Sequence, residues 1–183
     1  MWRRRRLPPC ACRSETPHTP RVLGLPFWHP GALLATWFGV GLAPVAPGSL
    51  ASIVALPMAW AIRGLWGEPG LAIAAAIVFA AGCWAAAMAV AASGRDDPGA
   101  VVIDEVAGQL LALLAAAPSL LGWVSAFLLF RLFDIWKPWP VRWADRRVAG
   151  GLGIMLDDLL AAGYVALILF GLAALGGAVG VRS

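Results

Sequence analysis

Residues 130–140 read FRLFDIWKPWP, and this stretch sets the plan of the fold. It places Asp134 and Lys137, the only lysine of the chain, directly after a long apolar segment. Pro138 and Pro140 do not continue a helix. The sequence therefore predicts a helix that ends here, with Asp134 and Lys137 on one side of its last turn. Charged side chains beside an apolar segment are costly in a membrane protein and usually mark a functional site.

The composition is that of an integral membrane protein. Of 183 residues, 61% are hydrophobic and only 13% are charged, and the mean hydropathy is +0.79. The net charge is +4, but the arginines lie beside apolar segments rather than on a polar domain. We interpret them as topology signals and lipid contacts, and we expect no nucleic-acid partner. No protein partner is indicated, and the oligomeric state stays open.

The chain divides into a basic arm, one membrane domain and a short tail. Residues 1–26 begin with four consecutive arginines and contain several prolines, which predicts a disordered cytoplasmic arm rather than a secretory signal. Residues 27–178 are predicted to form an all-α, polytopic membrane bundle with short or re-entrant helices. Residues 179–183 are the tail.

The first half of the membrane domain contains one short and two long helical segments. Residues 27–40 are apolar but too short to span, which predicts an interfacial or re-entrant helix. Three glycines and two prolines make residues 39–49 irregular. Ser49 is predicted to cap a helix over 49–66 at a terminus suited to phosphate, although a capped turn without ligand is an equal alternative. A second helix is predicted over 70–92.

Asp104 and Glu105 open the next apolar run. On a helix Asp104 and Gly108 share a face, and Gly108 with Ala112 forms a strip of small residues that lets another helix approach closely. Two carboxylates marking a helix start are the structural alternative. We favour a functional role, because two acids beside an apolar run are costly. By contrast, Asp96 and Asp97 precede a Pro-Gly turn and are interpreted as a solvated loop.

The segment between Glu105 and Arg131 is long enough for a single span. A single span would place Asp104 and Asp134 at opposite membrane faces, whereas a break at residues 118–119 permits a hairpin of two short helices. The positive-inside rule favours the hairpin and a site that faces the cytoplasm. The cations that follow the second arm are Arg131, Lys137, Arg142, Arg146 and Arg147.

The last part of the chain adds two more acids. Residues 141–149 are predicted to form an amphipathic segment in which Asp145 pairs with a neighbouring arginine, Arg142 or Arg146. Glycines then allow a turn into a final span over residues 154–175. Asp157 and Asp158 fall in its first turns, where the helix dipole favours their ionised form.

The resulting set of side chains suits phosphate chemistry with a divalent cation. No histidine follows His29, which excludes a histidine nucleophile and a zinc hydrolase site in the membrane domain. Clustered carboxylates suit magnesium, and lysine and arginine beside them suit a phosphate ester. The carboxylates are Asp104, Glu105, Asp134, Asp157 and Asp158.

Four motifs occur along the membrane domain: PGS at 47–49, DE..G at 104–108, FDIWKPWPVRW at 133–143 and GGLGIMLDD at 150–158. Together they closely resemble the phosphatidylglycerophosphatase A family, over roughly residues 27–175. The resemblance implies a magnesium-dependent enzyme of the bacterial cytoplasmic membrane. Such an enzyme removes the terminal phosphate of phosphatidylglycerophosphate to give phosphatidylglycerol.

The resemblance also implies roles for individual residues. It makes the five carboxylates catalytic and assigns a metal to four of them, Asp104, Glu105, Asp157 and Asp158. It assigns phosphate contacts to Lys137, Arg142, Ser49 and Arg131. Two other classes remain open. A CDP-alcohol phosphotransferase would also use aspartates and magnesium, and a proton- or cation-coupled transporter would also contain buried acids.

Overall fold

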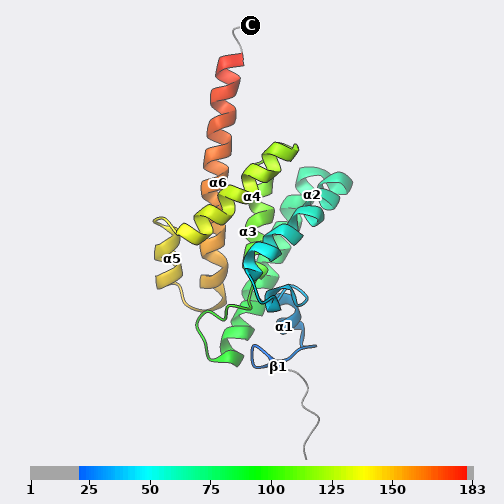
Figure 1. Cartoon of the computed structure of the whole chain (residues 1–183), viewed down its shortest axis with the longest axis vertical. Coiled ribbons are helices and arrows are strands. Elements are labelled where there is room, and N and C mark those ends of the chain that lie inside the picture. The colour runs from blue at the N-terminus through cyan, green and yellow to red at the C-terminus, as the bar shows by residue number, and fades with distance from the viewer. Residues whose placement is uncertain (1–20, 181–183) are drawn as a thin grey trace, which may run out of the picture.

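The computed structural model of the chain describes residues 21–180, with side-chain surroundings up to residue 175. Within this range the chain forms six α-helices, a short 3₁₀ turn and a two-stranded hairpin. Figure 1 shows the helices in one bundle, with α6 reaching beyond the others. The prediction of a helical protein is confirmed. The first 20 residues of the predicted disordered arm, and residues 181–183 of the predicted tail, lie outside the described range.

Residues 21–26, which the sequence assigns to the basic arm, form a small hairpin instead. Strand β1 (Arg21–Val22) pairs antiparallel with β2 (Leu25–Pro26). Both turn residues have positive φ, 56° and 77°, which matches the twist of a tight hairpin. A Cβ on Gly24 would lie 2.2 Å from the carbonyl oxygen of Ala92, so the hairpin sits directly against the end of the first long helix.

The segment before that long helix is short and irregular, as predicted. Helix α1 (Pro30–Ala35) has six residues, and the 3₁₀ turn η1 (Val40–Leu42) has three. The buried Thr36 hydroxyl donates to the Ala32 carbonyl oxygen at 2.8 Å and accepts from the Gly39 amide at 3.1 Å. Its hydroxyl therefore supplies partners for backbone groups in this buried turn.

Helix α2 (Pro47–Ser93) consists of two arms separated by a sharp break. Gly67 has φ 67° and ψ −161°, a conformation that glycine adopts readily and other residues avoid. Pro69 follows, near the start of the second arm, where proline is tolerated. The arms correspond to the two predicted helices, 49–66 and 70–92.

Helices α3 (Ile103–Leu114) and α4 (Leu120–Trp136) form the predicted hairpin. The Ser119 hydroxyl caps α4 by accepting from the Gly122 amide at 3.1 Å. Helix α3 has 12 residues. It is about 18 Å long, well short of a hydrocarbon core of about 30 Å. The chain thus reverses within the bundle, and the start of α3 and the end of α4 lie toward the same end of it (Figure 1).

Helices α5 (Val141–Arg147) and α6 (Gly150–Gly180) complete the described chain. A Cβ on Gly151 would lie 2.4 Å from the Cys83 carbonyl oxygen, so this glycine allows α6 to cross α2 closely. Helix α6 begins four residues earlier than predicted. Asp157 and Asp158 therefore lie about two turns inside the helix, and the prediction that the dipole of its first turn supports them is wrong.

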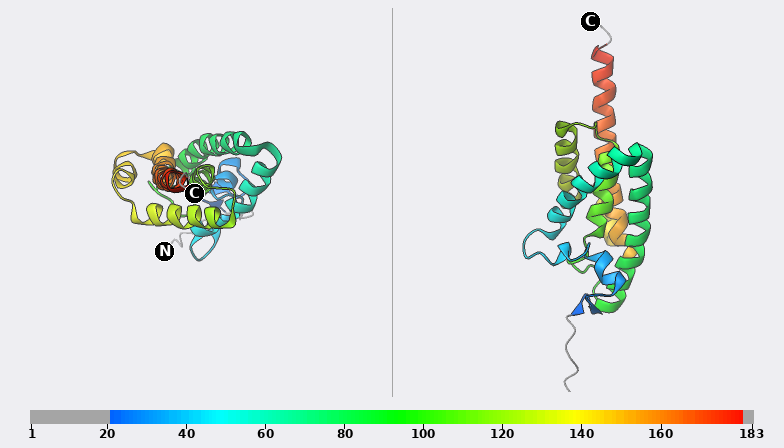
Figure 2. Two further views of the ribbon diagram at one scale, coloured as in Figure 1. Left: turned by 90° about the horizontal axis from the view of Figure 1, so that it is seen from above. Right: turned by 90° about the vertical axis from the view of Figure 1, so that its right-hand side faces the viewer.

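Helix α3 is the centre of the packing. It contacts α2, α4 and α6, and eight of its 12 residues are buried. The surrounding helices expose large apolar side chains, among them Leu65, Ile77, Leu128 and Leu167. Two segments, α2 and residues 150–175 of α6, are long and apolar enough to cross a membrane. Figure 2 shows α6 running lengthwise beside α2.

Candidate active site

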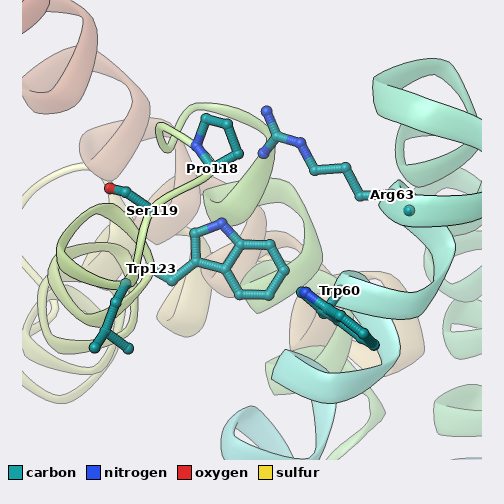
Figure 3. A pocket seen from close by; sticks show the side chains of 7 residues that line it. Trp60, Arg63, Pro118, Ser119 and Trp123 are labelled. Atoms are coloured by element: carbon teal, nitrogen blue, oxygen red, sulfur yellow. The ribbon is translucent and has the colours of Figure 1, made fainter.

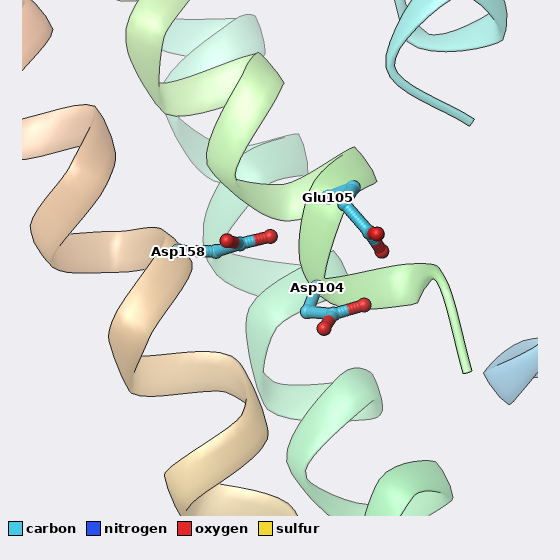
Figure 4. A group of neighbouring side chains, drawn as sticks. All are labelled: Asp104, Glu105 and Asp158. Carbon is cyan, nitrogen blue, oxygen red and sulfur yellow. The ribbon is translucent and has the colours of Figure 1, made fainter. Parts of the chain in front are cut away.

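Three carboxylates from two helices converge beside the middle of the bundle. Asp104 and Glu105 lie in the first turn of α3, and Asp158 lies on α6. One oxygen of each carboxylate can be chosen so that all three lie within 4.8 Å of one another. Figure 4 shows the three side chains gathered at the start of α3. Asp158 is almost fully buried, with 2% of its surface exposed.

Gly108 makes this convergence possible. A Cβ at this position would lie 2.6 Å from two ring atoms of Phe130 and 3.1 Å from the Cβ of Asp158. Only hydrogen fits between α3 and its neighbours here, because such distances are shorter than van der Waals contact. The prediction that Gly108 lets another helix approach closely is confirmed, and the approaching helices are α4 and α6.

Glu105 faces the beginning of α2. A Cβ on Gly48 would lie 2.0 Å from the Glu105 Oε1 atom. The helix starts at Pro47 after Ala46, which occupies the N-cap position with a positive φ of 45° and makes no side-chain cap hydrogen bond. The predicted capping role of Ser49 is therefore wrong, because Ser49 is already the third residue of the helix. Its half-buried side chain still lies in the first turn of α2, directly after Gly48, the residue that Glu105 approaches.

Arg131 and Asp134 form an ion pair on the last turns of α4. The Arg131 Nη1 atom lies 2.8 Å from the Asp134 Oδ2 atom and 3.9 Å from the Glu105 Oε1 atom. Both partners are about 14% exposed, so water screens this pair less than it would at a surface. Arg131 thus links the end of α4 to the start of α3.

Lys137 joins three helices. It is the C-cap of α4 in a left-handed conformation, with φ 47°. Its Nζ atom donates to Asp145 of α5 at 2.5 Å and to Asp157 of α6 at 2.7 Å. The predicted pairing of Asp145 with Arg142 or Arg146 is therefore wrong.

The same contacts fix the charge of Lys137. Burial by itself lowers the pKa of this ammonium group, but the hydrogen bonds to Asp145 and Asp157 outweigh burial and raise the pKa above its ordinary value. Deprotonation of Lys137 therefore breaks these ion pairs only when the pH rises above its folded pKa, which lies above the ordinary lysine value of about 10.4. Lys137 is consequently a cation at neutral pH and not a proton acceptor.

A polar cavity of about 330 Å³ connects these groups. Its walls include Asp104, Glu105, Asp134, Lys137 and Asp157, together with residues of α5 and of the turn before α6. Asp96 and Asp97 also line this cavity. Both are exposed, which agrees with a solvated loop, but the sequence analysis missed their position at the site.

Arg142 lies apart from this cavity. It is exposed on α5 and lines a separate groove formed by the end of α4, the following turn and α5. The structure thus brings the predicted residues Asp104, Glu105, Asp134, Asp157, Asp158, Lys137 and Arg131 together, but it does not bring Arg142 among the carboxylates.

Gln109 is a further polar residue that sequence reasoning missed. It lies one turn after Glu105 on α3 and is completely buried. Neither its Nε2 nor its Oε1 atom has a hydrogen-bond partner among the described residues. Burying an amide without hydrogen bonds costs free energy. A glutamine within an apolar helical segment was therefore the sequence signal that could have identified this residue.

The carboxylate cluster fits a metal ion by its donor chemistry. The Asp104 Oδ1, Glu105 Oε2 and Asp158 Oδ2 atoms are buried, and residues 21–180 offer them no hydrogen-bond partner. Carboxylates this close repel one another when ionised and require a compensating cation. A set made only of carboxylate oxygens suits a hard divalent cation rather than zinc.

A larger cavity, of about 490 Å³, lies between the first arm of α2 and the turn that joins α3 to α4 (Figure 3). Arg63 from its wall donates to the carbonyl oxygens of Leu113 at 3.2 Å and Ala116 at 3.1 Å. These bonds satisfy the free end of α3. Among the described residues no carboxylate lines this cavity, so we do not assign the reaction to it, although its volume is larger.

Buried carboxylates beside a lysine and an arginine, surrounded by apolar helices, are typical of a class of enzymes that act on phosphate esters. The model of the family described as phosphatidylglycerophosphatase A matches residues 33–173. The chain belongs to this family and is a phosphatase. No solved structure matches it significantly.

Three curated relatives are similar over most of their length. Phosphatidylglycerophosphatase A of Escherichia coli is 39% identical over 145 residues, covering 78% of this chain and 81% of the relative. The Haemophilus influenzae protein of the same name is 40% identical, covering 78% and 88%. A Bacteroides thetaiotaomicron protein provisionally named phosphatidylinositol-3-phosphatase is 38% identical over 143 residues, covering 72% and 86%.

Proposed function

We propose that the protein hydrolyses the terminal phosphomonoester of phosphatidylglycerophosphate, giving phosphatidylglycerol and phosphate, in bacterial phospholipid synthesis. The observation that carries the proposal is the meeting of Asp104, Glu105 and Asp158 from two helices beside Arg131 and Lys137. Family membership supplies the reaction class, and two relatives carry the name of this activity.

Magnesium is the proposed cofactor, held by Asp104, Glu105 and Asp158. When bound it would neutralise the phosphoryl oxygens and polarise the phosphorus centre or a water molecule. Asp157 belongs to the same cavity, but its Oδ2 atom is occupied by Lys137. We therefore assign Asp157 first to positioning Lys137, and only second to the metal.

The cations of the site would bind the transferred phosphate. Arg131 is oriented by Asp134 and lies against Glu105, so its guanidinium is aimed at the carboxylate cluster. Lys137 reaches the cavity between Asp145 and Asp157, and a phosphate oxygen would replace one of these partners. Ser49 follows Gly48 in the first turn of α2, and this helix N-terminus with its hydroxyl would be a further phosphate contact.

The reaction needs one nucleophile and one proton transfer. Either a carboxylate takes the proton of an attacking water, or a carboxylate attacks phosphorus and water then cleaves the acyl phosphate. In both routes the leaving glycerol oxygen gains a proton. Trapping by rapid acid quench during single-turnover hydrolysis separates them, since only the second route leaves phosphate covalently bound to the enzyme.

The proposed setting is the bacterial inner membrane, with several spans and the site at the cytoplasmic face. The two long apolar helices and the apolar outer surface support a membrane location. Arg142, Arg146 and Arg147 near the cavity support the cytoplasmic orientation through the positive-inside rule. A cysteine introduced at Glu68, an exposed residue at the turn between the two arms of α2, should react with an impermeant reagent added from the periplasm.

Phosphate release from phosphatidylglycerophosphate by purified protein tests the proposal. We expect release with magnesium, and none after chelation or in the variant Asp158→Asn. A protein that releases no phosphate under any metal condition would favour the transporter class, while transfer of a phosphoalcohol group would favour a CDP-alcohol phosphotransferase. Family membership argues against both classes.

A further inference from the structure

A groove with a different character adjoins the acidic cavity. It has a volume of about 480 Å³ and is formed by the end of α4, the turn after it and α5. Of residues 21–180, four cationic side chains and no carboxylate line it: Lys137, Arg142, Arg146 and Arg147. Three tryptophans line it as well, and all are more than half exposed: Trp136 at 62%, Trp139 at 78% and Trp143 at 51%. We call this feature the basic groove.

The basic groove is built on fixed elements. Val141 and Ala144 of α5 are fully buried, which leaves Arg142 and Trp143 on the outer face of that helix. The Tyr164 hydroxyl of α6 donates to the Trp139 carbonyl oxygen, so the turn between the two prolines is attached to α6. The groove wall is thus held by the same helix that carries Asp157 and Asp158.

The basic groove and the acidic cavity share a wall. Lys137, Arg146 and Arg147 line both. Arg142 lines only the groove. A ligand that places one anionic group among the carboxylates and metal therefore finds a second cationic site directly adjacent.

The proposed substrate has two such groups. Phosphatidylglycerophosphate carries a terminal phosphomonoester and, one glycerol away, an internal phosphodiester. Phosphatidylinositol 3-phosphate, for which the Bacteroides relative is provisionally named, also carries one of each on a single polyol. A short polyol requires two adjoining phosphate sites rather than two distant ones.

We propose that the basic groove binds the internal phosphodiester of the lipid substrate, with Arg142 as its main contact. This inference rests on the proposed function. Arginine offers a planar set of donors that matches a phosphate group. Tryptophans at this position suit the headgroup level of a membrane, where the acyl chains leave the groove. The groove would then select lipids with a diester over simple phosphomonoesters.

The variant Arg142→Gln tests the proposal in neutral-detergent micelles. We expect its KM for phosphatidylglycerophosphate to rise about tenfold, the loss of one charge-assisted contact, with a smaller change in kcat. The preference for this lipid over glycerol 3-phosphate, which lacks a diester, should fall by the same factor. Arg95→Gln is the matched control, because Arg95 is an exposed arginine that lines neither the cavity nor the groove. An unchanged KM and preference in Arg142→Gln would overturn the proposal.

Inhibition by phosphatidylglycerol tests whether the groove binds the diester of the substrate itself or the diester of a neighbouring lipid. We expect phosphatidylglycerol to inhibit competitively, with an inhibition constant that rises in Arg142→Gln. Noncompetitive inhibition or activation would overturn the proposal in favour of a separate lipid at the groove.

Failure of the proposed function gives a different result. If wild-type protein releases no phosphate, lipid binding to the basic groove can still be measured separately. The measurement is the quenching of tryptophan fluorescence by a brominated phosphatidylglycerol. We expect weaker quenching affinity in Arg142→Gln than in Arg95→Gln, and equal affinities would refute the groove.

Discussion

Replacing Gly108 by alanine should disable the site while leaving the bundle folded. The added Cβ would lie 2.6 Å from two ring atoms of Phe130 and 3.1 Å from the Cβ of Asp158. Favourable carbon contacts need about 3.5–4.0 Å, so α4 or α6 must retreat by roughly 1 Å. Phe130 is fully buried, so its ring has little freedom to move away alone.

The magnitude follows from this displacement. Overpacking of a core costs about 1–3 kcal/mol, and the better helix propensity of alanine offsets about 1 kcal/mol of it. The net loss of stability is therefore modest. A shift of about 1 Å at a reacting group costs about 100-fold in rate. The added methyl group would contact the Cβ atom of Asp158 and would therefore displace this carboxylate. We expect kcat/KM for phosphatidylglycerophosphate to fall about 100-fold.

The assay is phosphate release in detergent micelles, with thermal unfolding measured on the same samples. Gly163→Ala is the matched control, because Gly163 also lies on a helix but has no atom within 4 Å of its added Cβ. It should keep wild-type turnover. Wild-type turnover in Gly108→Ala would refute the reasoning that this glycine sets the distance between Asp104 and Asp158.

Further predictions concern the metal, the lysine and the far end of the bundle. Chelation with EDTA should abolish phosphate release, and added magnesium should restore it. The variant Asp158→Asn should release no phosphate at any magnesium concentration. Its membrane insertion, measured by cell fractionation, should stay normal. Lys137→Met should reduce turnover at least tenfold and lower the thermal midpoint, because it leaves two carboxylates without their cation. Arg63→Met should cost about 1–3 kcal/mol of stability, seen as a lower thermal midpoint, with kcat nearly unchanged, because it removes donors from two helix-end carbonyls far from the cavity.

Each of these predictions has a contradicting outcome. Full activity in EDTA would remove the metal from the proposal, and wild-type rates in Asp158→Asn would remove the assigned ligand. Wild-type turnover and stability in Lys137→Met would show that the ion pairs do not hold the site. A loss of kcat in Arg63→Met without a loss of stability would connect the far cavity to the reaction.

The course of the chain was predictable because breakers interrupt long apolar runs. Gly67 breaks α2, and the Pro118-Ser119 step separates α3 from α4 and caps the start of α4, so both hairpins followed from local sequence signals. The sequence also predicted that the start of α3 and the end of α4 lie at the same end of the bundle. Only a hairpin of these two helices places their charged residues, Asp104 and Asp134, at the same face of the membrane. Helix ends were less predictable. Helix α2 begins at Pro47, and Ala46 in a left-handed conformation is its N-cap, although the residue preferences for the N-cap position favoured Ser49.

The partners within the site were harder to predict. Asp145 binds Lys137 because Val141 and Ala144 bury one face of α5 and thereby fix its rotation, and sequence spacing does not contain that rotation. Asp96 and Asp97 reach the cavity through a loop whose course depends on tertiary packing. Arg142 has the residue type expected of a phosphate contact, but the direction of α5 places it in the adjoining groove.

The upper half of α6 determines how this protein can be handled in the laboratory. Leu167, Phe170, Leu172 and Leu175 are all more than 60% exposed where the helix extends past its neighbours. In water these exposed side chains would drive self-association, whereas among lipid acyl chains their exposure carries no free-energy cost. We therefore expect the folded protein to require a detergent or nanodisc, whose hydrophobic thickness should be matched to this helix before any rate is compared between variants.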